Sequence, residues 1–256
     1  MGIKAVLFDL GGTLIHFEGP WNEVMSSANQ ELVKYLKDEG LNLHEKQFLA
    51  TLERRLGEYY AQREAEFIEY TTANVLRDLL LELGFKNITQ DFLRPALNRL
   101  YAVSQAHWKR EDDAVSTLSQ LRDRGLRMAI ISNASDDADV QTLVDNAGLR
   151  DFFEVILSSA HAGIRKPNPV IFQKALSSLE ISAAEAAMVG DTLGADILGA
   201  RNAGIYSIWI TRRADTPGNR DHLDTILPDA EIARLSELPS LLENLEHQGT
   251  KTIAKK

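Results

Sequence analysis

Residues 4–14 read Lys-Ala-Val-Leu-Phe-Asp-Leu-Gly-Gly-Thr-Leu, a short apolar run that ends at one carboxylate and turns through two glycines. Residues 5–8 are apolar on both alternating faces, which is typical of a strand buried in a parallel sheet between two layers of helices. Asp9 then lies at the carboxyl end of that strand, where open α/β sheets bind ligands, and Gly11-Gly12 lets backbone N–H groups approach an anion. The stretch predicts Asp9 as a nucleophile, although an aspartate that only bonds its own turn gives the same pattern.

From residue 110 onward, strand and helix patterns alternate as in an α/β domain. Buried strands are predicted at residues 126–131, 155–157, 186–189 and 206–210, with a short edge strand at 229–232. Helices are predicted at residues 114–124, 139–147, 169–179, 196–203 and 238–245. This alternation predicts a Rossmann-like, doubly wound parallel sheet of the α/β class.

Residues 16–109 show helical periodicity with no strand pattern between the helices. Four apolar stripes begin at Val24, Phe48, Val75 and Phe92. They predict an α-helical bundle inserted into the α/β chain. We therefore divide the chain into an α/β core at residues 1–15 and 110–246, a helical domain at 16–109, and a disordered polar tail at 247–256.

The composition excludes several classes of function. The 256 residues include 28 basic and 37 acidic side chains, and the net charge of −9 gives no overall electrostatic reason to bind nucleic acid or anionic lipid. Cysteine is absent, which excludes disulfides and a thiol nucleophile. No stretch approaches about 18 apolar residues and the N-terminus shows no apolar targeting segment, so we expect a cytoplasmic protein with no membrane partner.

Small polar residues follow three of the predicted strands. Asp9 ends the first, Ser132-Asn133 the second and Gly190-Asp191 the fourth, and Lys166 lies in the loop between the last two. In a doubly wound sheet the carboxyl ends of neighbouring strands converge on one crevice. Two carboxylates there suit Mg²⁺, while a hydroxyl and a lysine suit phosphate oxygens. Taken singly, a helix cap, a solvated lysine or an ordinary turn would explain the same residues.

Four short motifs occur in order along the chain: Phe8-Asp9-Leu10-Gly11-Gly12-Thr13-Leu14, Ile131-Ser132-Asn133, Arg165-Lys166-Pro167 and Gly190-Asp191-Thr192-Leu193-Gly194-Ala195-Asp196-Ile197. They resemble the four motifs of the haloacid dehalogenase-like (HAD) hydrolases. The helical insertion between the first and second motifs resembles the helical cap of that family. The resemblance covers nearly the whole chain and implies a phosphatase-like member.

The resemblance implies a role for each matching residue. Asp9 would attack phosphorus and form an aspartyl-phosphate, which splits one difficult displacement into two. Thr13 would orient the loop or hydrogen-bond near this nucleophile. Ser132 and the amide of Asn133 would hold the transferring phosphoryl group, and Lys166 would offset its charge.

The same resemblance implies a metal. Asp9, Asp191 and the backbone carbonyl of Gly11 would bind Mg²⁺, with Asp196 in support, and the Gly11-Gly12 turn would face the substrate. The implied function is Mg²⁺-dependent hydrolysis of a small phosphorylated metabolite by a monomer or homodimer.

The sequence departs from the family pattern at Gly11. Family phosphatases usually have a second aspartate at this position, which protonates the leaving group and then activates water. General acid–base catalysis contributes about 10²–10⁴-fold, so ordinary phosphate esters should react slowly without it. Three explanations remain open: the substrate has an activated leaving group, a residue such as His16 supplies the proton, or the protein is a phosphate-ligand-binding or regulatory protein with little turnover.

Two further chemistries of the superfamily are more distant alternatives. Phosphonate hydrolases have a small residue at the position of Gly11 but rely on a cap lysine, and the candidates Lys34 and Lys37 lie on a helix face that we predict to be solvated. The 2-haloacid dehalogenases do without a metal, whereas this chain keeps Asp191 together with Asp196. Phosphate ester hydrolysis therefore remains the preferred interpretation.

Overall fold

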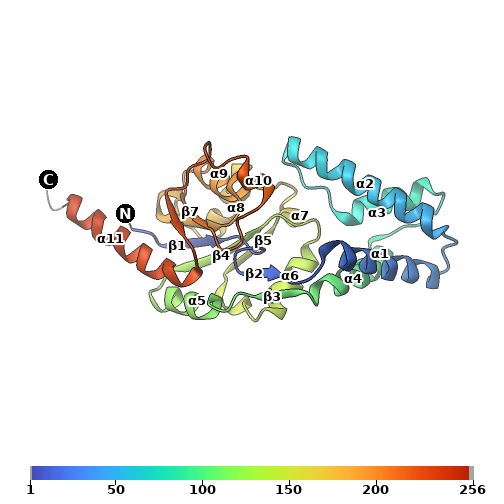
Figure 1. The fold of residues 1–256 in the computed structure, drawn as a ribbon, viewed down its shortest axis with the longest axis horizontal. Coiled ribbons are helices and arrows are strands. Elements are labelled where there is room, and N and C mark those ends of the chain that lie inside the picture. Colours follow the sequence, from blue (N-terminus) through green and yellow to red (C-terminus); the bar gives the residue numbers. More distant parts are fainter. Residues whose placement is uncertain (1, 254–256) are drawn as a thin grey trace.

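The computed structural model describes residues 2–253, and its core is a six-stranded parallel sheet (Figure 1). The strand order is β5-β4-β1-β6-β7-β8. The strands are β1 (Ala5–Phe8), β4 (Arg127–Ser132), β5 (Val155–Ser158), β6 (Ala186–Gly190), β7 (Tyr206–Ile210) and β8 (Ala230–Ile232). β1 lies in the middle, where Phe8 is paired with Ile130 of β4 on one side and Val189 of β6 on the other. The predicted α/β sheet is confirmed.

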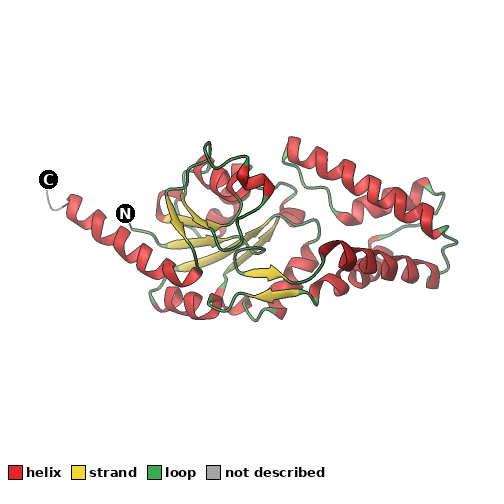
Figure 2. Cartoon of the chain, viewed as in Figure 1, coloured by secondary structure: helices red, strands yellow, loops and turns green. Residues whose placement is uncertain are grey.

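Helices cover both faces of this sheet (Figure 2). One face packs against α5 (Ala114–Asp123), α6 (Asp137–Asn146) and α11 (Leu238–Ile253). The other packs against α8 (Pro169–Ser178) and α9 (Leu198–Asn202). Shorter segments are α7 (Ser159–Ala162), α10 (Pro217–Arg220), a π-helical turn at Leu193–Ile197 and 3₁₀ turns at Arg150–Phe152, Ala183–Glu185 and Leu235–Glu237.

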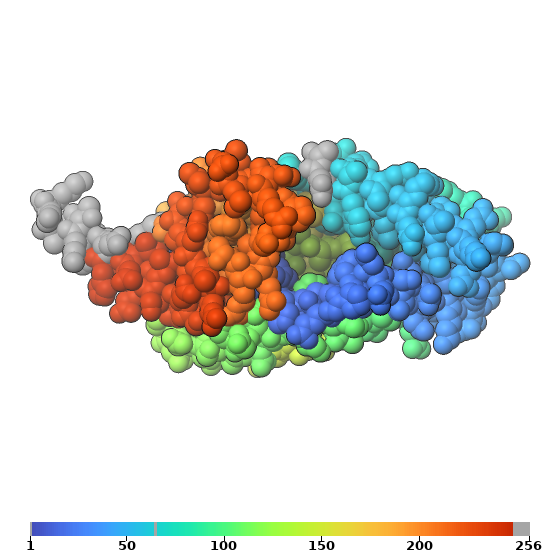
Figure 3. Space-filling view, in the orientation of Figure 1, coloured from blue at the N-terminus to red at the C-terminus, as the bar shows by residue number. Residues whose placement is uncertain are grey.

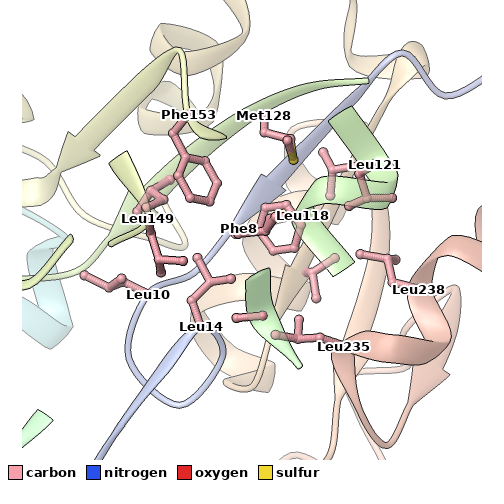
Figure 4. Packing of buried hydrophobic residues seen from close by; sticks show 14 of the residues in the cluster. Phe8, Leu10, Leu14, Leu118, Leu121, Met128, Leu149, Phe153, Leu235 and Leu238 are labelled. Atoms are coloured by element: carbon pink, nitrogen blue, oxygen red, sulfur yellow. The ribbon is translucent and has the colours of Figure 1, made fainter. Parts of the chain in front are cut away.

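β1 contributes side chains to two hydrophobic cores. Val6 and Phe8 belong to the core on the α5 side, where the rings of Phe8 and Phe153 meet edge to face with centroids 6.0 Å apart. Ala5 and Leu7 belong to the core on the α8 side. Figure 4 shows leucines from several elements around the Phe8 ring. The strand that carries the candidate nucleophile at its end is therefore fixed from both faces.

The inserted helices form a bundle beside the sheet (Figure 1). They are α1 (Trp21–Asp38), α2 (Glu45–Glu66), α3 (Thr72–Glu82) and α4 (Gln90–Gln105). Their shared core contains Leu32, Leu36, Phe48, Leu52, Leu76, Leu79, Leu93 and Leu97. Thr71 and Thr89 cap α3 and α4 by accepting the N–H groups of Asn74 and Phe92. The four predicted helices are thus present, with a core of their own.

A short antiparallel ribbon, which the sequence did not predict, joins the insertion to the core. β2 (Ile15–Phe17) pairs with β3 (Trp108–Arg110), so the two connections between the parts run side by side. Three-residue strands are too short to show a periodic pattern, and their partners are about 90 residues apart in the chain. Phe17 and Trp108 pack edge to face across the ribbon.

A second contact joins the α2–α3 connection to the core. Ile68 and Ile164 form an isolated antiparallel bridge. Beside it, the buried Glu69 carboxylate accepts hydrogen bonds from Ser159 Oγ at 2.7 Å and Arg165 Nη1 at 3.0 Å, and another from the Tyr59 hydroxyl. The insertion is therefore held to the core at a point far from the ribbon in sequence.

The C-terminal helix is longer than expected. We predicted a helix at residues 238–245 and a disordered tail at 247–256, but α11 extends to Ile253. The disordered tail stays a prediction, and residues 254–256 lie outside the described residues. No helix in the described part of the chain is long and apolar enough to cross a membrane.

The Glu69 contact generates a stability prediction. Glu69→Ala removes the buried carboxylate that accepts hydrogen bonds from Ser159, Arg165 and Tyr59, and breaking a buried, hydrogen-bonded charge pair typically costs about 3–5 kcal/mol. We expect the midpoint of urea unfolding to fall markedly. Glu66→Ala, which changes an exposed glutamate at the C-terminal end of α2, three residues before Glu69, is the matched control and should behave as wild type. Equal midpoints for all three proteins would contradict a stabilising role for Glu69.

Candidate active site

The carboxyl ends of three neighbouring strands meet at one edge of the sheet. Because β1 lies between β4 and β6, Asp9 after β1 comes close to Ser132 at the end of β4 and Asp191 after β6. The Asp9 N–H donates to the Val189 carbonyl at 2.9 Å, which continues the sheet by one residue. Carboxylate oxygens of Asp9, Asp191 and Asp196 lie within 4.8 Å of one another. The three acids named in the sequence analysis thus form one cluster.

A buried lysine binds two of these carboxylates. Lys166 Nζ donates to Oδ1 of Asp9 and to Oδ1 of Asp196, each at 2.6 Å, and to the Ile131 carbonyl at 2.7 Å. These three acceptors match the three donors of an ammonium group. Burial lowers the pKa of Lys166, but the two carboxylates raise it by more, so the amine stays charged.

The side chain of Asn133 positions this lysine. Asn133 Nδ2 donates to the Lys166 carbonyl at 3.0 Å, and Asn133 Oδ1 accepts the Lys166 N–H at 2.8 Å. The following peptide bond, Lys166-Pro167, is cis. The resemblance implies that the amide of Asn133 binds the phosphoryl group, and that role stays a prediction. The Asn133 side chain has a second role that we did not predict: it holds Lys166 by two hydrogen bonds.

Burial and mutual repulsion raise the pKa values of two acids in the cluster. Burial raises the pKa of Asp9 to about 6, with Lys166 opposing this shift and Asp196 adding to it. Burial also raises the pKa of Asp191 to about 8, to which the charges of Asp9 and Asp196 contribute. Three carboxylates beside one ammonium carry excess negative charge when ionised. A hard divalent cation such as Mg²⁺, which prefers oxygen ligands, fits this donor set.

Close packing around Asp191 explains the second glycine of the first motif. Gly12 has a φ of +84°, and a Cβ there would lie 2.6 Å from Asp191 Oδ2, so both backbone and space require glycine. The next residue, Thr13, is fully buried and its Oγ1 donates to Asp191 Oδ1 at 3.4 Å, a long hydrogen bond. Thr13 therefore contacts Asp191; its expected role, to orient the loop or to hydrogen-bond near Asp9, stays a prediction.

Two residues that we did not predict hold the loop that carries Asp191. Asn219 Nδ2 and Trp209 Nε1 donate to the Asp191 carbonyl at 2.8 and 2.9 Å. Asn219 Oδ1 also accepts the Leu193 N–H at 2.8 Å, so its amide bridges both ends of the turn. The only sequence signal for Asn219 is a polar residue in a short Pro-Gly-Asn segment, which is typical of any turn.

A cavity of about 360 Å³ is in contact with the cluster, a volume that suits a small ligand. Figure 3 shows that the surface is hollowed between the core and the helical insertion. Ten residues of the predicted motifs line the cavity: Asp9, Leu10, Gly11, Ser132, Asn133, Arg165, Lys166, Thr192, Ala195 and Asp196. Its other walls include Ile15, Trp108, Asp139 and Leu143.

Trp108 occupies the space beside Gly11. A Cβ on Gly11 would lie 3.2 Å from Cη2 of the Trp108 indole. Gly11 is not among the described glycines with a positive φ, so the indole, and not the backbone, restricts a side chain at this position. Its carbonyl remains a predicted metal ligand.

The structure does not bring His16 into this cavity. Its Nδ1 lies 2.9 Å from Glu111 Oε1 and its Nε2 3.3 Å from Glu18 Oε1, in a separate hollow. Successive side chains of a strand point to opposite faces, so Ile15 lines the cavity and His16 points away from it. The predicted contact between His16 and substrate is therefore corrected.

Comparison with known proteins identifies the family. Residues 3–204 match the sequence profile of the haloacid dehalogenase-like hydrolases. The chain belongs to this family. It is 29% identical over 245 residues to a glyceraldehyde 3-phosphate phosphatase of Methanopyrus kandleri, in an alignment that covers 95% of this chain and 98% of that protein. The resemblance inferred from the four motifs is confirmed.

Solved structures of HAD proteins share the fold over almost the whole chain. A 2-haloacid dehalogenase from Pseudomonas syringae has a TM-score of 0.66 and 26% identity, covering 95% of this chain and 99% of that one. A HAD phosphatase from Thermococcus onnurineus has a TM-score of 0.60 and 24% identity, covering 94% and 98%. Hydrolases with different reactions thus share this fold, so the reaction has to be inferred from the residues of the site and not from the fold.

The raised pKa values predict that stability falls with rising pH. The folded protein keeps protons on Asp9 and Asp191 at pH values where the unfolded chain has released them, so the free energy of unfolding should decrease as pH rises from about 4 to about 8. We expect lower melting temperatures at pH 8 than at pH 5 in buffer with a chelator. Asp191→Asn should flatten the upper part of this dependence. A wild type whose stability rises over the same interval would show that these acids are not destabilised by burial.

Proposed function

We propose that this HAD hydrolase is a Mg²⁺-dependent phosphatase that acts on a small phosphorylated metabolite through an aspartyl-phosphate on Asp9. The observation that carries the proposal is the position of Lys166 Nζ, 2.6 Å from the Asp9 carboxylate at the wall of the cavity. A fixed positive charge there favours the ionised nucleophile and attracts a phosphoryl group. The similarity to a protein named glyceraldehyde 3-phosphate phosphatase supports a small phosphorylated substrate.

The chain's own residues divide the work of the reaction. Asp9 forms a bond to phosphorus as the bond to the leaving oxygen breaks, and water later releases the phosphate from Asp9. Ser132 and the N–H of Asn133 bind phosphoryl oxygens, while Lys166 offsets their charge. Thr13 keeps the loop after the nucleophile packed against Asp191.

Three groups would hold the metal: the carboxylates of Asp9 and Asp191 and the carbonyl of Gly11. When bound, Mg²⁺ offsets negative charge on the phosphoryl oxygens. Asp196 Oδ1 accepts from Lys166 Nζ and Oδ2 accepts the Thr192 N–H at 3.0 Å, so Asp196 fixes the lysine at the edge of the metal site.

We also propose that residues 16–109 act as a cap over the core at residues 1–15 and 110–246. Ile15 and Trp108 lie in the two connections between the insertion and the core, and both line the cavity. Part of the cavity wall is therefore formed by these connections. Gly19, which has a φ of +118°, lies next to Pro20 in the first connection, and we propose this pair as the hinge. Substrate would enter by opening at this ribbon, and closure would exclude water.

A phosphate-binding protein with little turnover is the second candidate, favoured by the missing side chain at Gly11. Dehalogenation and phosphonate hydrolysis have less support. The cluster of Asp9, Asp191 and Asp196 suits a divalent cation, which the metal-free dehalogenase reaction does not need. Lys34 and Lys37, the cap lysines considered for imine formation, are not in the cavity wall, and Lys37 pairs with Glu45 at 2.7 Å on the outside of the insertion.

Replacing the nucleophile gives a direct test. Asp9→Asn preserves the size of the side chain but cannot form an acyl phosphate, so hydrolysis of 4-nitrophenyl phosphate with Mg²⁺ should fall on the order of 10³-fold or more. A chelator should abolish the wild-type rate, and Mg²⁺ should restore it. Mass spectrometry of the wild type quenched with acid should detect phosphate on Asp9.

Thermal melting controls for the fold of the variant. Wild-type rates in a folded Asp9→Asn protein would overturn the assignment of Asp9. Complete inactivity of the wild type toward activated phosphates, combined with tight binding of inorganic phosphate, would favour the second candidate.

A further inference from the structure

On an ester of an alcohol, the proposed phosphatase reaction needs a proton donor at the leaving oxygen, and neither the Gly11 position nor His16, the residue suggested for this role, provides one. An alcohol leaves phosphorus poorly as an alkoxide unless a proton is delivered while the bond breaks. Gly11 has no side chain, the Trp108 indole fills the space beside it, and His16 faces Glu111 and Glu18 outside the cavity. For an ester of an alcohol, another group in the cavity wall would therefore have to carry the proton.

Asp139 is an acid in this wall that has no other assigned role. The acids that line the cavity are Asp9, Asp139 and Asp196. Asp9 is the proposed nucleophile, and Asp196 is bound to Lys166 and the Thr192 N–H. Asp139 lies in the first turn of α6, the helix that follows the Ser132 loop, so it is held on a rigid element next to the phosphoryl-binding residues.

One oxygen of Asp139 is fixed, and the other is available. Gln105 Nε2, at the end of α4, donates to Asp139 Oδ1 at 2.8 Å. Oδ2 has no hydrogen-bond partner among the described residues. The nearby Arg94 does not pair with Asp139, because its Nη1 binds both oxygens of Asp136 at 3.0 and 2.9 Å. The carboxyl is thus oriented by a neutral amide and is not locked in an ion pair.

The surroundings of Asp139 favour exchange of its proton near neutral pH. Burial raises the pKa of Asp139 to about 6, with Gln105 and Arg94 lowering it and Asp136 raising it. An acid whose pKa lies near the working pH can both give and regain a proton, which is the requirement for a group that acts in two successive half-reactions.

We propose that Asp139 is the general acid and general base of this enzyme and takes the place of the side chain missing at Gly11. In the first half-reaction Asp9 bonds to phosphorus, the bond from phosphorus to the leaving oxygen breaks, and the Asp139 carboxyl gives its proton to that oxygen. In the second, the Asp139 carboxylate takes a proton from water as the water oxygen bonds to phosphorus and the bond to Asp9 breaks. The products are an alcohol and phosphate, and both aspartates return to their starting states. This inference rests on the proposed phosphatase function.

The test compares two substrates of similar size that differ in their need for an acid. Phenyl phosphate has a poor leaving group, and 4-nitrophenyl phosphate has a good one. We expect Asp139→Asn to lower kcat/KM on the order of 10²-fold for phenyl phosphate and less than about tenfold for 4-nitrophenyl phosphate. Asp145→Asn, an exposed change in the last turn of the same helix, is the matched control and should change neither value.

A second variant tests the proton itself and does not depend on the folding of the first. Gln105→Met removes the hydrogen bond that favours the ionised carboxylate, so it should raise the pKa of Asp139. Because the first half-reaction uses the protonated acid, the alkaline limb of kcat/KM for phenyl phosphate should move to higher pH. The profile for 4-nitrophenyl phosphate, which reports the other titrating groups, should move little.

The outcomes separate this proposal from the function on which it rests. Equal losses on both substrates, or full activity of Asp139→Asn toward phenyl phosphate, would overturn the role of Asp139 and leave the phosphatase assignment standing. An unmoved limb in Gln105→Met would also overturn it. A wild type that forms no phosphoenzyme from either substrate with Mg²⁺ would overturn the phosphatase function, and the role of Asp139 with it.

Discussion

The contact of the Lys166 ammonium with the carboxylates of Asp9 and Asp196 is the interaction on which the site depends. Each buried charge costs several kcal/mol in lost hydration, and the cost is recovered only when the geometry is close to ideal. The three residues come from the end of β1, the loop before α8 and the turn after β6, so the sheet has to bring them together. The parallel order that places β1 between β4 and β6 meets this requirement, and the alternating side chains of β1 anchor it in two cores.

Features that depend on local sequence could be predicted. The apolar run at residues 5–8 identified the central strand because a strand buried on both faces needs apolar side chains at every position. The apolar stripes at residues 16–109 predicted the four helices of the insertion, because each helix packs one apolar face into a common core. The site acids followed from their places after strands, because carboxyl ends converge in any doubly wound sheet. The approach of the Gly11-Gly12 backbone to an anion stays a prediction, and the close neighbour of Gly12 in the structure is Asp191.

Features that depend on contacts between distant segments of the chain could not be predicted from the sequence. Three-residue strands such as β2 and β3 leave no distinctive pattern in the sequence. Glu69 and Asn219 are single polar residues of a kind that is common in loops and turns. Asp139 looked like an ordinary acidic residue near the start of a helix, where negative charge is expected because of the helix dipole. The expected contact between His16 and substrate failed for a similar reason. His16 is close to Asp9 in sequence, but the sequence does not indicate on which face of β2 the side chain lies.

The contact between the α2–α3 connection and the core has a mechanical consequence. Its backbone is bonded to the segment that leads into Lys166, because the Arg165 N–H donates to the Phe67 carbonyl at 3.0 Å and the Glu69 N–H to the Gly163 carbonyl at 3.1 Å. A movement that lifts the insertion from the core must break these bonds or pull residues 163–165 along with it. Lys166, which contacts Asp9, lies one residue beyond this backbone contact. In the proposed opening of the insertion, access to the cavity and the charge balance within it would therefore be coupled through the backbone.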